Sequence, residues 1–278
     1  MSKKFEKGKM VPVPSHAIIP ERDIDKSPIL ECSHLGIDFG GLRAVNDFNL
    51  TIGRTEIAGL IGPNGAGKTT IFNLLTKVYQ PTKGTILLDG KDTNGMTTAQ
   101  VNRAGIARTF QNIRLFNDLS VEENVTVAMD SQMHYNMFSG IFRLPGFWKE
   151  EKVVHERALE LLDLFHMADM ADVKAGSLPY GAQRRLEIVR ALATNPSLLL
   201  LDEPAAGMNP SETAELMENI RKIRDTFEIA VLLIEHDMSL VMGVCERIYV
   251  LDYGTLIASG TPDEIRSNDK VIKAYLGG

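Results

Sequence analysis

A glycine-rich stretch in the first third of the chain has the residue types and spacing of a phosphate-binding loop. Gly62 is followed by four residues and then by Gly67, Lys68 and Thr69, a spacing at which backbone N–H groups turn towards phosphate oxygens. Lys68 supplies a positive charge for the outer phosphates, and Thr69 supplies a hydroxyl for Mg²⁺. The residues predicted to bind a nucleotide are Gly62, Pro63, Asn64, Gly65, Ala66, Gly67, Lys68, Thr69 and Thr70.

Two carboxylates after a second apolar run complete a possible hydrolytic site. Residues 198–201 are four leucines, and Asp202 and Glu203 follow them. A buried strand that ends in an acid places that acid at the carboxyl edge of the sheet, beside the phosphate loop. Asp202 is then the predicted Mg²⁺ ligand, and Glu203 the predicted general base for an attacking water. Alone, an Asp-Glu pair would indicate only a solvated strand end, but the phosphate loop favours the catalytic interpretation.

Two further polar residues follow short apolar segments. His236 comes shortly after the apolar run 229–234, and Gln111 follows residues 107–110. His236 could donate a hydrogen bond to the terminal phosphate, and Gln111 could hold Mg²⁺ or the water. Taken singly, each could also be an ordinary polar residue at a strand end or in a loop. The predicted catalytic residues are Glu203, His236 and Gln111, and the predicted metal ligands are Thr69, Gln111 and Asp202.

Strands that alternate with helices must position these residues. Residues 56–61, before the loop, are an apolar run of buried-strand length, and residues 71–75, after it, are apolar at helical spacing. The pattern predicts an α/β fold with a largely parallel sheet, an antiparallel portion at the N-terminal end and an inserted helical segment. The predicted strands are residues 29–35, 48–52, 57–61, 85–88, 107–110, 198–201, 229–234, 248–251 and 256–259, the last two as a hairpin. The predicted helices are residues 121–133, 149–165, 182–194 and 211–227, and a final one that Thr261 caps and Pro262 begins.

The pattern also predicts a simple domain organisation. Residues 1–28 contain several lysines and four prolines, which favour an N-terminal arm outside the domain. Such an arm is either a loosely packed tail or a contact for a partner or for anionic lipid. Residues 29–278 are predicted to form one domain, with a helical subdomain at about residues 117–190.

Composition excludes several classes of protein. A net charge of -6 over 278 residues argues against a broad basic face for nucleic acid. Cys32 and Cys245 fit no metal-ligand spacing and are predicted to be buried, reduced thiols. No apolar run reaches the length of a membrane span, and the N-terminus lacks the apolar region of a secretory signal.

Taken in order, these motifs resemble those of the ATP-binding-cassette (ABC) ATPases, and the resemblance covers residues 29–278. In that family, Gln111 corresponds to the Q-loop, residues 198–203 to the Walker B strand and His236 to the switch histidine. Phe39 stands where the family has an aromatic residue that stacks on adenine. The resemblance implies the ABC ATPase fold, with ATP as the nucleotide and Mg²⁺ as the metal ion.

A further motif corresponds to the family signature, which is usually Leu-Ser-Gly-Gly-Gln. Here the motif is Leu178, Pro179, Tyr180, Gly181, Ala182 and Gln183. The resemblance implies that it faces the nucleotide on a second subunit, so that two subunits close head to tail over two ATP molecules. Pro179 replaces the serine and removes a hydroxyl and a backbone N–H, and Asn209 replaces a common aspartate. These two differences leave open whether the two ATP sites are equivalent.

The chain is more closely similar to the larger ATPase subunit of branched-chain amino acid importers. The motifs that carry this similarity are residues 39–45, 108–112, 180–187, 205–210 and 271–277. It implies that ATP hydrolysis powers import of branched-chain, hydrophobic amino acids. The implied partners are a second ABC ATPase subunit, permease subunits and, indirectly, a substrate-binding protein, without nucleic acid. The implied location is the cytoplasmic face of the inner (plasma) membrane, as a peripheral subunit in a bacterium or archaeon.

Alternatives to this function are a urea, amide or lipid cargo and a non-transport ABC ATPase.

The insert at residues 130–149 also fits the importer group. It contains five aromatic residues that either pack locally or form a docking surface for the permease: Tyr135, Phe138, Phe142, Phe147 and Trp148.

Overall fold

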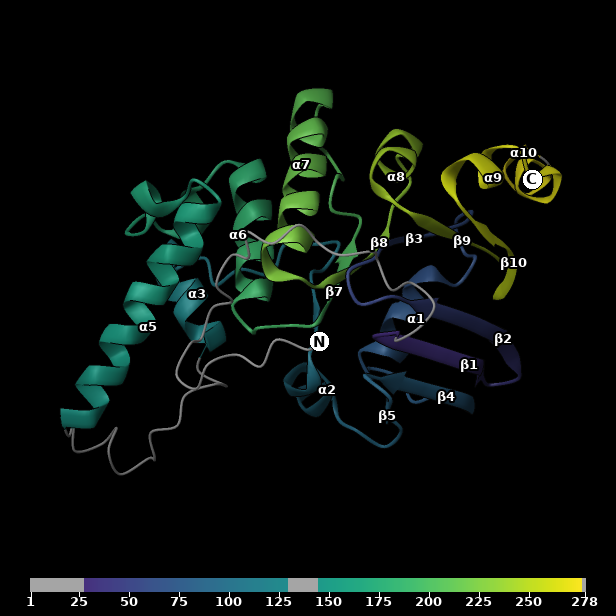
Figure 1. Ribbon diagram of the computed structural model, residues 1–278, viewed down its shortest axis with the longest axis horizontal. Coiled ribbons are helices and arrows are strands. Elements are labelled where there is room, and N and C mark those ends of the chain that lie inside the picture. The colour runs from purple at the N-terminus through teal and green to yellow at the C-terminus, as the bar shows by residue number, and fades with distance from the viewer. Residues whose placement is uncertain (1–27, 130–144, 277–278) are drawn as a thin grey trace. The chain divides into compact units, whose positions relative to one another are not determined.

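The computed structural model describes residues 28–129 and 145–276 (Figure 1). Within these residues the chain forms two compact units, one made of residues 112–196 and the other of residues 28–111 together with residues 197–276. The predicted N-terminal arm lies outside the described residues except for Pro28. The five aromatic residues of the insert likewise lie where no side chains are described.

The larger unit contains a six-stranded sheet with the strand order β10-β9-β3-β8-β7-β6. Its strands are β3 (Ile57–Ile61), β6 (Ile106–Arg108), β7 (Leu198–Asp202), β8 (Ala230–Ile234), β9 (Arg247–Asp252) and β10 (Thr255–Gly260). All pairs are parallel except β9 with β10, which form the predicted hairpin. Every residue of β3, β7 and β8 is buried. This burial explains why the sequence shows these strands as continuous apolar runs.

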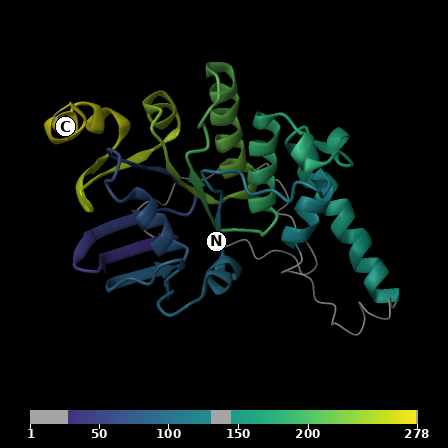
Figure 2. The same ribbon diagram turned by 180° about the vertical axis from the view of Figure 1, so that it is seen from behind.

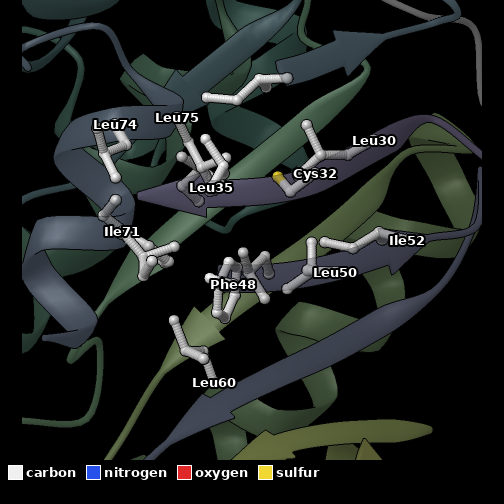
Figure 3. Close-up of a cluster of buried hydrophobic side chains, with 14 of the residues drawn as sticks. Leu30, Cys32, Leu35, Phe48, Leu50, Ile52, Leu60, Ile71, Leu74 and Leu75 are labelled. Atoms are coloured by element: carbon white, nitrogen blue, oxygen red, sulfur yellow. The ribbon is translucent and has the colours of Figure 1, made fainter. Parts of the chain in front are cut away.

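An antiparallel sheet with the order β2-β1-β4-β5 lies in the same unit. Its strands are β1 (Leu30–Phe39), β2 (Leu42–Ile52), β4 (Lys83–Leu88) and β5 (Lys91–Asp92). Figure 3 shows buried side chains of β1, β2 and helix α1 (Lys68–Leu75) gathered with Leu60 of β3 into one cluster. The core thus joins the two sheets and α1, and Figures 1 and 2 show the sheets as separate groups of strands. The predicted α/β class and the N-terminal antiparallel portion are confirmed.

Five more helices belong to the larger unit. They are α2 (Thr98–Ala104), α7 (Pro210–Phe227), α8 (Met238–Val244), α9 (Pro262–Arg266) and α10 (Asp269–Leu276). Thr261 caps α9 and Pro262 begins it, as predicted. Sequence reasoning missed α2 and α8. Both have a side-chain cap that could have indicated them: Thr97 forms a capping box with Gln100, and Asp237 accepts hydrogen bonds from two N–H groups of α8.

The smaller unit is helical. Its described elements are α3 (Val121–Met129), α5 (Pro145–Leu164) and α6 (Tyr180–Leu192), with 3-10 turns at Ala168–Met170 and Ala175–Ser177. Helix α3 packs against both α5 and α6. On α5 the buried residues recur at helical spacing at Val154, Ala158, Leu161 and Leu162, which is the pattern of an amphipathic helix with one face in a core.

Two predicted element boundaries were wrong in ways that matter for the site. The strand predicted at residues 29–35 continues to Phe39, because β1 passes Gly36 with bulges and then pairs again with β2. The helix predicted at residues 182–194 begins at Tyr180 and ends at Leu192, so Pro179 is its N-cap. None of the described helices is long and apolar enough to cross a membrane.

Both cysteines are free and buried, as predicted. Burial raises the pKa of the Cys32 thiol and of the Cys245 thiol well above the ordinary value. Because the thiolate is the reactive form, we expect a disulfide reagent such as DTNB to label neither thiol of the native protein within minutes at pH 8. After unfolding in guanidinium, both thiols should react. Rapid labelling of one thiol in the folded protein would contradict this burial.

Candidate functional site

The phosphate loop joins the end of β3 to the start of α1. Gly62, Gly65 and Gly67 have φ angles of 155°, 80° and 103°. Residues other than glycine rarely adopt such positive φ angles. A Cβ at Gly62 would lie 2.1 Å from the carbonyl oxygen of Leu251, so only glycine fits where the loop passes β9. Gly67 is the N-cap of α1 and has no side chain with which to cap it. Capping of the first N–H groups of α1 is therefore left to water or to an anionic ligand.

Lys68 lies across the phosphate loop. Its ammonium donates hydrogen bonds to the carbonyl oxygens of Gly62 at 2.6 Å and Pro63 at 3.0 Å. Burial lowers the pKa of Lys68, and the nearby carboxylates of Glu203 and Asp202 oppose this shift. A positive charge that is partly removed from water attracts phosphate more strongly than an exposed one, which suits the role predicted for this lysine.

Three residues predicted to be catalytic meet at one carboxylate. One oxygen of Glu203 accepts a hydrogen bond from the side-chain amide of Gln111 at 2.6 Å. The other lies 2.6 Å from Nε2 of His236. Gln111 follows β6, Glu203 follows β7 and His236 follows β8, and these strands are neighbours with the same direction. Parallel strands thus bring the three side chains to one edge of the sheet, which is where the sequence predicted the acids after β7 to lie.

The backbone at Glu203 is held in an unusual conformation. Its φ is 48°, and its N–H donates to the carbonyl oxygen of Ile234 at 2.9 Å. A non-glycine residue in this region carries strain that the surroundings must maintain. Glu235 helps to maintain it, because this buried carboxylate accepts hydrogen bonds from the N–H groups of Ala205 at 2.7 Å and His236 at 3.0 Å. Glu235 thus links the turns that follow β7 and β8.

Sequence reasoning assigned no role to Glu235, which directly follows β8. Burial raises the pKa of its carboxyl, and the hydrogen bonds from the backbone of Ala205, His236 and Asp237 oppose the shift. Its signal in the sequence is that a second acid follows a second buried strand, at the same edge as Asp202.

Asp202 ends β7 and is buried. One of its carboxylate oxygens lies 2.6 Å from the guanidinium of Arg108, at the end of β6. Sequence reasoning placed Asp202 at this edge but assigned no role to Arg108, since nothing local marks an arginine of a short strand as buried. The hydroxyl of Thr69 is also predicted to bind Mg²⁺, and Thr69 is exposed in the first turn of α1.

Phe39 ends β1 and keeps 41% of its surface exposed. Its ring forms a T-shaped contact with the ring of Tyr79, with centroids 5.1 Å apart and planes 73° apart. An edge contact fixes the orientation of the Phe39 ring without covering both of its faces. A ring held in this way can stack on a base, and Tyr79 is a supporting residue that sequence reasoning missed.

The signature motif lies in the helical unit, at the start of α6. Pro179 is the N-cap with φ -56° and ψ 151°, where the proline ring fits and no helical hydrogen bond needs its N–H. Gln183 donates from its side chain to the carbonyl oxygen of Leu178 at 2.9 Å. The N–H groups of Tyr180, Gly181 and Ala182 begin the helix, so the loss of serine leaves the donors of the first turn in place.

A buried ion pair supports the signature helix. Arg184 lies 3.2 Å from Glu187, and both side chains are almost completely buried. Arg184 also donates to the hydroxyl of Tyr180 at 3.2 Å, and its guanidinium lies 5.5 Å from the Tyr180 ring centroid. The side chain of Tyr180 is therefore tied to its own helix.

Asn209 has a structural role that its amide can fill. Its side-chain oxygen accepts hydrogen bonds from the N–H groups of Ser211 at 2.9 Å and Glu212 at 3.0 Å, and Glu212 bonds back to the N–H of Asn209. This is a complete capping box for α7, which begins at Pro210. Asparagine caps helices as well as aspartate does, so the substitution preserves the turn.

The C-terminal helix α10 contacts the phosphate loop. Burial raises the pKa of Tyr275, and a backbone hydrogen bond from Gly62 opposes this shift. Helix and loop also line one cavity of about 480 Å³, with Lys270 and Lys273 on the helical side. The C-terminal helix thus shapes the outer side of the loop.

Comparison with protein families supports the resemblance seen in the motifs. Residues 45–206 match the model of the ABC transporter family. Residues 255–278, which include β10, α9 and α10, match the model of the branched-chain amino acid ATP-binding cassette transporter.

Comparison with individual proteins gives the same result. The chain is 49% identical over 250 residues to the high-affinity branched-chain amino acid transport ATP-binding protein LivG of Escherichia coli K12, covering 90% of this chain and 98% of LivG. Among solved structures, an ATP-binding cassette of an ABC transporter in its ADP conformation matches with a TM-score of 0.78 and 29% identity, covering 90% of this chain and 99% of that one. A dimeric cassette in a post-hydrolysis state with ADP and Pi matches with a TM-score of 0.70 and 26% identity, over 84% and 98%.

Proposed function

Since the chain belongs to the ABC transporter family and is an ATPase of that family, we propose that it powers an importer of branched-chain amino acids. The observation that carries the hydrolytic role is the carboxylate of Glu203, held between Gln111 and His236 beside the phosphate loop. The amino acid cargo rests on the similarity to LivG and on the match of residues 255–278.

Phe39 and the phosphate loop bind ATP in this proposal. The exposed ring of Phe39 stacks on adenine, and the backbone of residues 62–70 surrounds the phosphates. The ammonium of Lys68 exchanges its bonds to Gly62 and Pro63 for phosphate oxygens. This exchange needs little movement, because the ammonium already lies within the loop.

The residues predicted to hold Mg²⁺ fit that ion. Thr69, Gln111 and Asp202 offer hydroxyl, amide and carboxylate oxygens, which are the hard donors that Mg²⁺ prefers. Dedicated protein ligands are few in such sites, because the nucleotide phosphates supply the others. When bound, Mg²⁺ neutralises charge on the terminal phosphates.

Glu203 takes the proton of the attacking water. Gln111 and His236 each engage one carboxylate oxygen, and each oxygen retains a second lone pair that can accept a water. The two contacts therefore orient the base without blocking it. His236 then donates to the transferring phosphoryl group, and Gln111 transmits the state of the nucleotide to the partner subunits.

The proposed assembly is a head-to-tail pair of ATPase subunits on a permease. A relative of the same fold is dimeric in a post-hydrolysis state, and the signature motif here retains the N–H groups of a helix start for the opposite ATP. The permease would hold the chain at the cytoplasmic face of the inner membrane, and a substrate-binding protein would deliver the cargo. The other ATPase is either a second copy or a smaller paired subunit.

Uptake in a deletion strain tests the cargo. Cells that lack this chain should lose most of their high-affinity uptake of labelled leucine, isoleucine and valine, and a plasmid copy should restore it. Urea, short amides and aromatic amino acids serve as the comparison panel. Loss of uptake of urea or amides with unchanged leucine uptake would contradict a branched-chain cargo while leaving the ATPase assignment intact.

Phe39→Ala should weaken ATP binding by about tenfold, since stacking on a base contributes roughly 1–3 kcal/mol. Phe39→Trp should bind ATP about as tightly as the unmodified chain. Tripolyphosphate, which lacks a base, should bind the phosphate loop equally well in the unmodified chain and in both variants. Leu42→Ala, which removes an exposed apolar side chain opposite Phe39 in the same hairpin, is the matched control. An equal loss of tripolyphosphate affinity in Phe39→Ala would contradict stacking.

A further inference from the structure

Arg108 is buried beside the acid that ends β7. Parallel pairing sets Arg108 opposite Leu200, and Asp202 lies two residues further along the same strand. The guanidinium and the carboxylate are 2.6 Å apart, and the two side chains are 7% and 6% exposed. An ion pair at this depth contributes little net stability, because desolvation offsets the attraction. The ladder between β6 and β7 already joins the two strands, so the pair is not needed to hold them together.

The same guanidinium also contacts the helix of the phosphate loop. It donates to the side-chain oxygen of Asn73 at 2.7 Å, and it lies 5.5 Å from the ring centroid of Phe72 and 5.1 Å from that of Phe110. Asn73 and Phe72 belong to α1, whereas Phe110 directly precedes Gln111. The side chain of Arg108 therefore contacts helix α1, Asp202 at the end of β7, and the residue that precedes Gln111.

This geometry restricts how Asp202 can turn. The bond from Arg108 engages the Oδ2 oxygen of Asp202, and Oδ1 accepts no hydrogen bond from the residues that the structure describes. Two aromatic rings and Asn73 fix the plane of the guanidinium in turn, and arginine, unlike lysine, holds a carboxylate in a defined orientation. The outer-shell partners of metal ligands orient them in this way.

We propose that Arg108 is a positioning residue that holds the Asp202 carboxylate by Oδ2 and so presents Oδ1 to the Mg²⁺ that accompanies ATP. The proposal rests on the proposed function, because it requires that MgATP bind at this site. This role affects one ligand and not the other: Arg108 supports the binding of Mg²⁺ and contributes little to the binding of nucleotide when Mg²⁺ is absent.

Nucleotide binding with and without Mg²⁺ tests the proposal on the full chain. A fluorescent ATP analogue is titrated in EDTA and then at rising Mg²⁺ concentration. Arg108→Met should raise the half-saturating Mg²⁺ concentration by about tenfold, the lower end of what outer-shell changes cost, and leave the affinity in EDTA unchanged. Arg103→Met, which changes an exposed arginine of α2, should match the unmodified chain in both titrations.

A double variant separates positioning from general stability. In the background of Asp202→Asn, which itself raises the Mg²⁺ requirement, Arg108→Met should add no further shift. An additive shift, or an equal loss of affinity with and without Mg²⁺, would overturn the proposal. If Arg108→Met lowers the urea midpoint of unfolding, Arg108→Lys replaces it, since lysine keeps the charge without the two-armed geometry. Arg108→Lys should then show a smaller shift that is likewise confined to Mg²⁺, and an Mg²⁺-independent loss would overturn the proposal.

Measurements on the unmodified chain distinguish a failure of the proposed function from a failure of the positioning role of Arg108. If it fails to bind the analogue under any condition, the proposed function is contradicted. If it binds normally and the Arg108 variants behave like Arg103→Met, only the positioning role is contradicted.

Discussion

Glu203→Gln is expected to lower ATP turnover by at least about 100-fold, which is the contribution of a general base, while ATP still binds. Glutamine has nearly the shape of glutamate, so it keeps a polar contact with His236 and Gln111, but its amide cannot accept the proton of the attacking water. Nucleotide should therefore accumulate unhydrolysed on the protein, and the ATPase pair should remain closed. Steady-state phosphate release and retention of labelled ATP on a filter measure the two effects.

A surface glutamate provides the control for this change. Glu218→Gln removes an exposed pair with Arg221 on α7, and exposed pairs of this kind contribute at most about 1 kcal/mol to stability. Its turnover should match that of the unmodified chain. Normal hydrolysis by Glu203→Gln would remove Glu203 from the role of base and would favour His236 or an acid of the partner subunit.

Lys68→Met is expected to weaken ATP binding by about 100-fold, since a charge-assisted hydrogen bond contributes roughly 1.5–3 kcal/mol and this ammonium meets phosphate in a partly desolvated site. The loss of its bonds to Gly62 and Pro63 is offset by removal of a partly buried charge. The free energy of unfolding without nucleotide should therefore change by no more than about 1 kcal/mol. Calorimetric titration with ATP and urea unfolding measure the two quantities.

Lys77 is the matched control for Lys68. Burial also lowers the pKa of Lys77, and its ammonium donates to Asn94 at 3.3 Å, away from the phosphate loop. Lys77→Met makes the same chemical change to a second buried lysine and should leave ATP affinity within about twofold of normal, a change of under 0.5 kcal/mol. Equal losses of affinity in the two variants would show that lost stability, and not a missing phosphate contact, causes the effect.

The parts of the site that lie along one strand or loop were predictable from the sequence. The glycine loop at 62–70 and the leucines before Asp202 carry their chemistry and their secondary structure in adjacent residues. Because neighbouring parallel strands end at one edge, the acid after β7 and the histidine after β8 could be expected to meet. The hydrogen bonds of Glu203 with Gln111 and His236 agree with that expectation, while their catalytic roles stay predictions.

The contacts that sequence reasoning missed join residues far apart in the chain. Arg108 meets Asn73 and Asp202, which are 35 and 94 residues away, and no local spacing reveals such partners. Tyr79 likewise contacts Phe39 of β1 from a distant part of the chain. The extension of β1 to Phe39 was missed for a local reason. A glycine such as Gly36 suggests the end of a strand, whereas β1 continues through Gly36 with bulges.

The most direct test of the proposed transport role is leucine uptake into vesicles that contain the proposed assembly, in which this chain and a second ATPase subunit are bound to a permease. With ATP inside and leucine-loaded binding protein outside, labelled leucine should accumulate and phosphate should be released together. Both should stop when the chain carries Glu203→Gln. Leucine accumulation that continues when the chain carries Glu203→Gln, or phosphate release that the loaded binding protein does not stimulate, would contradict the account.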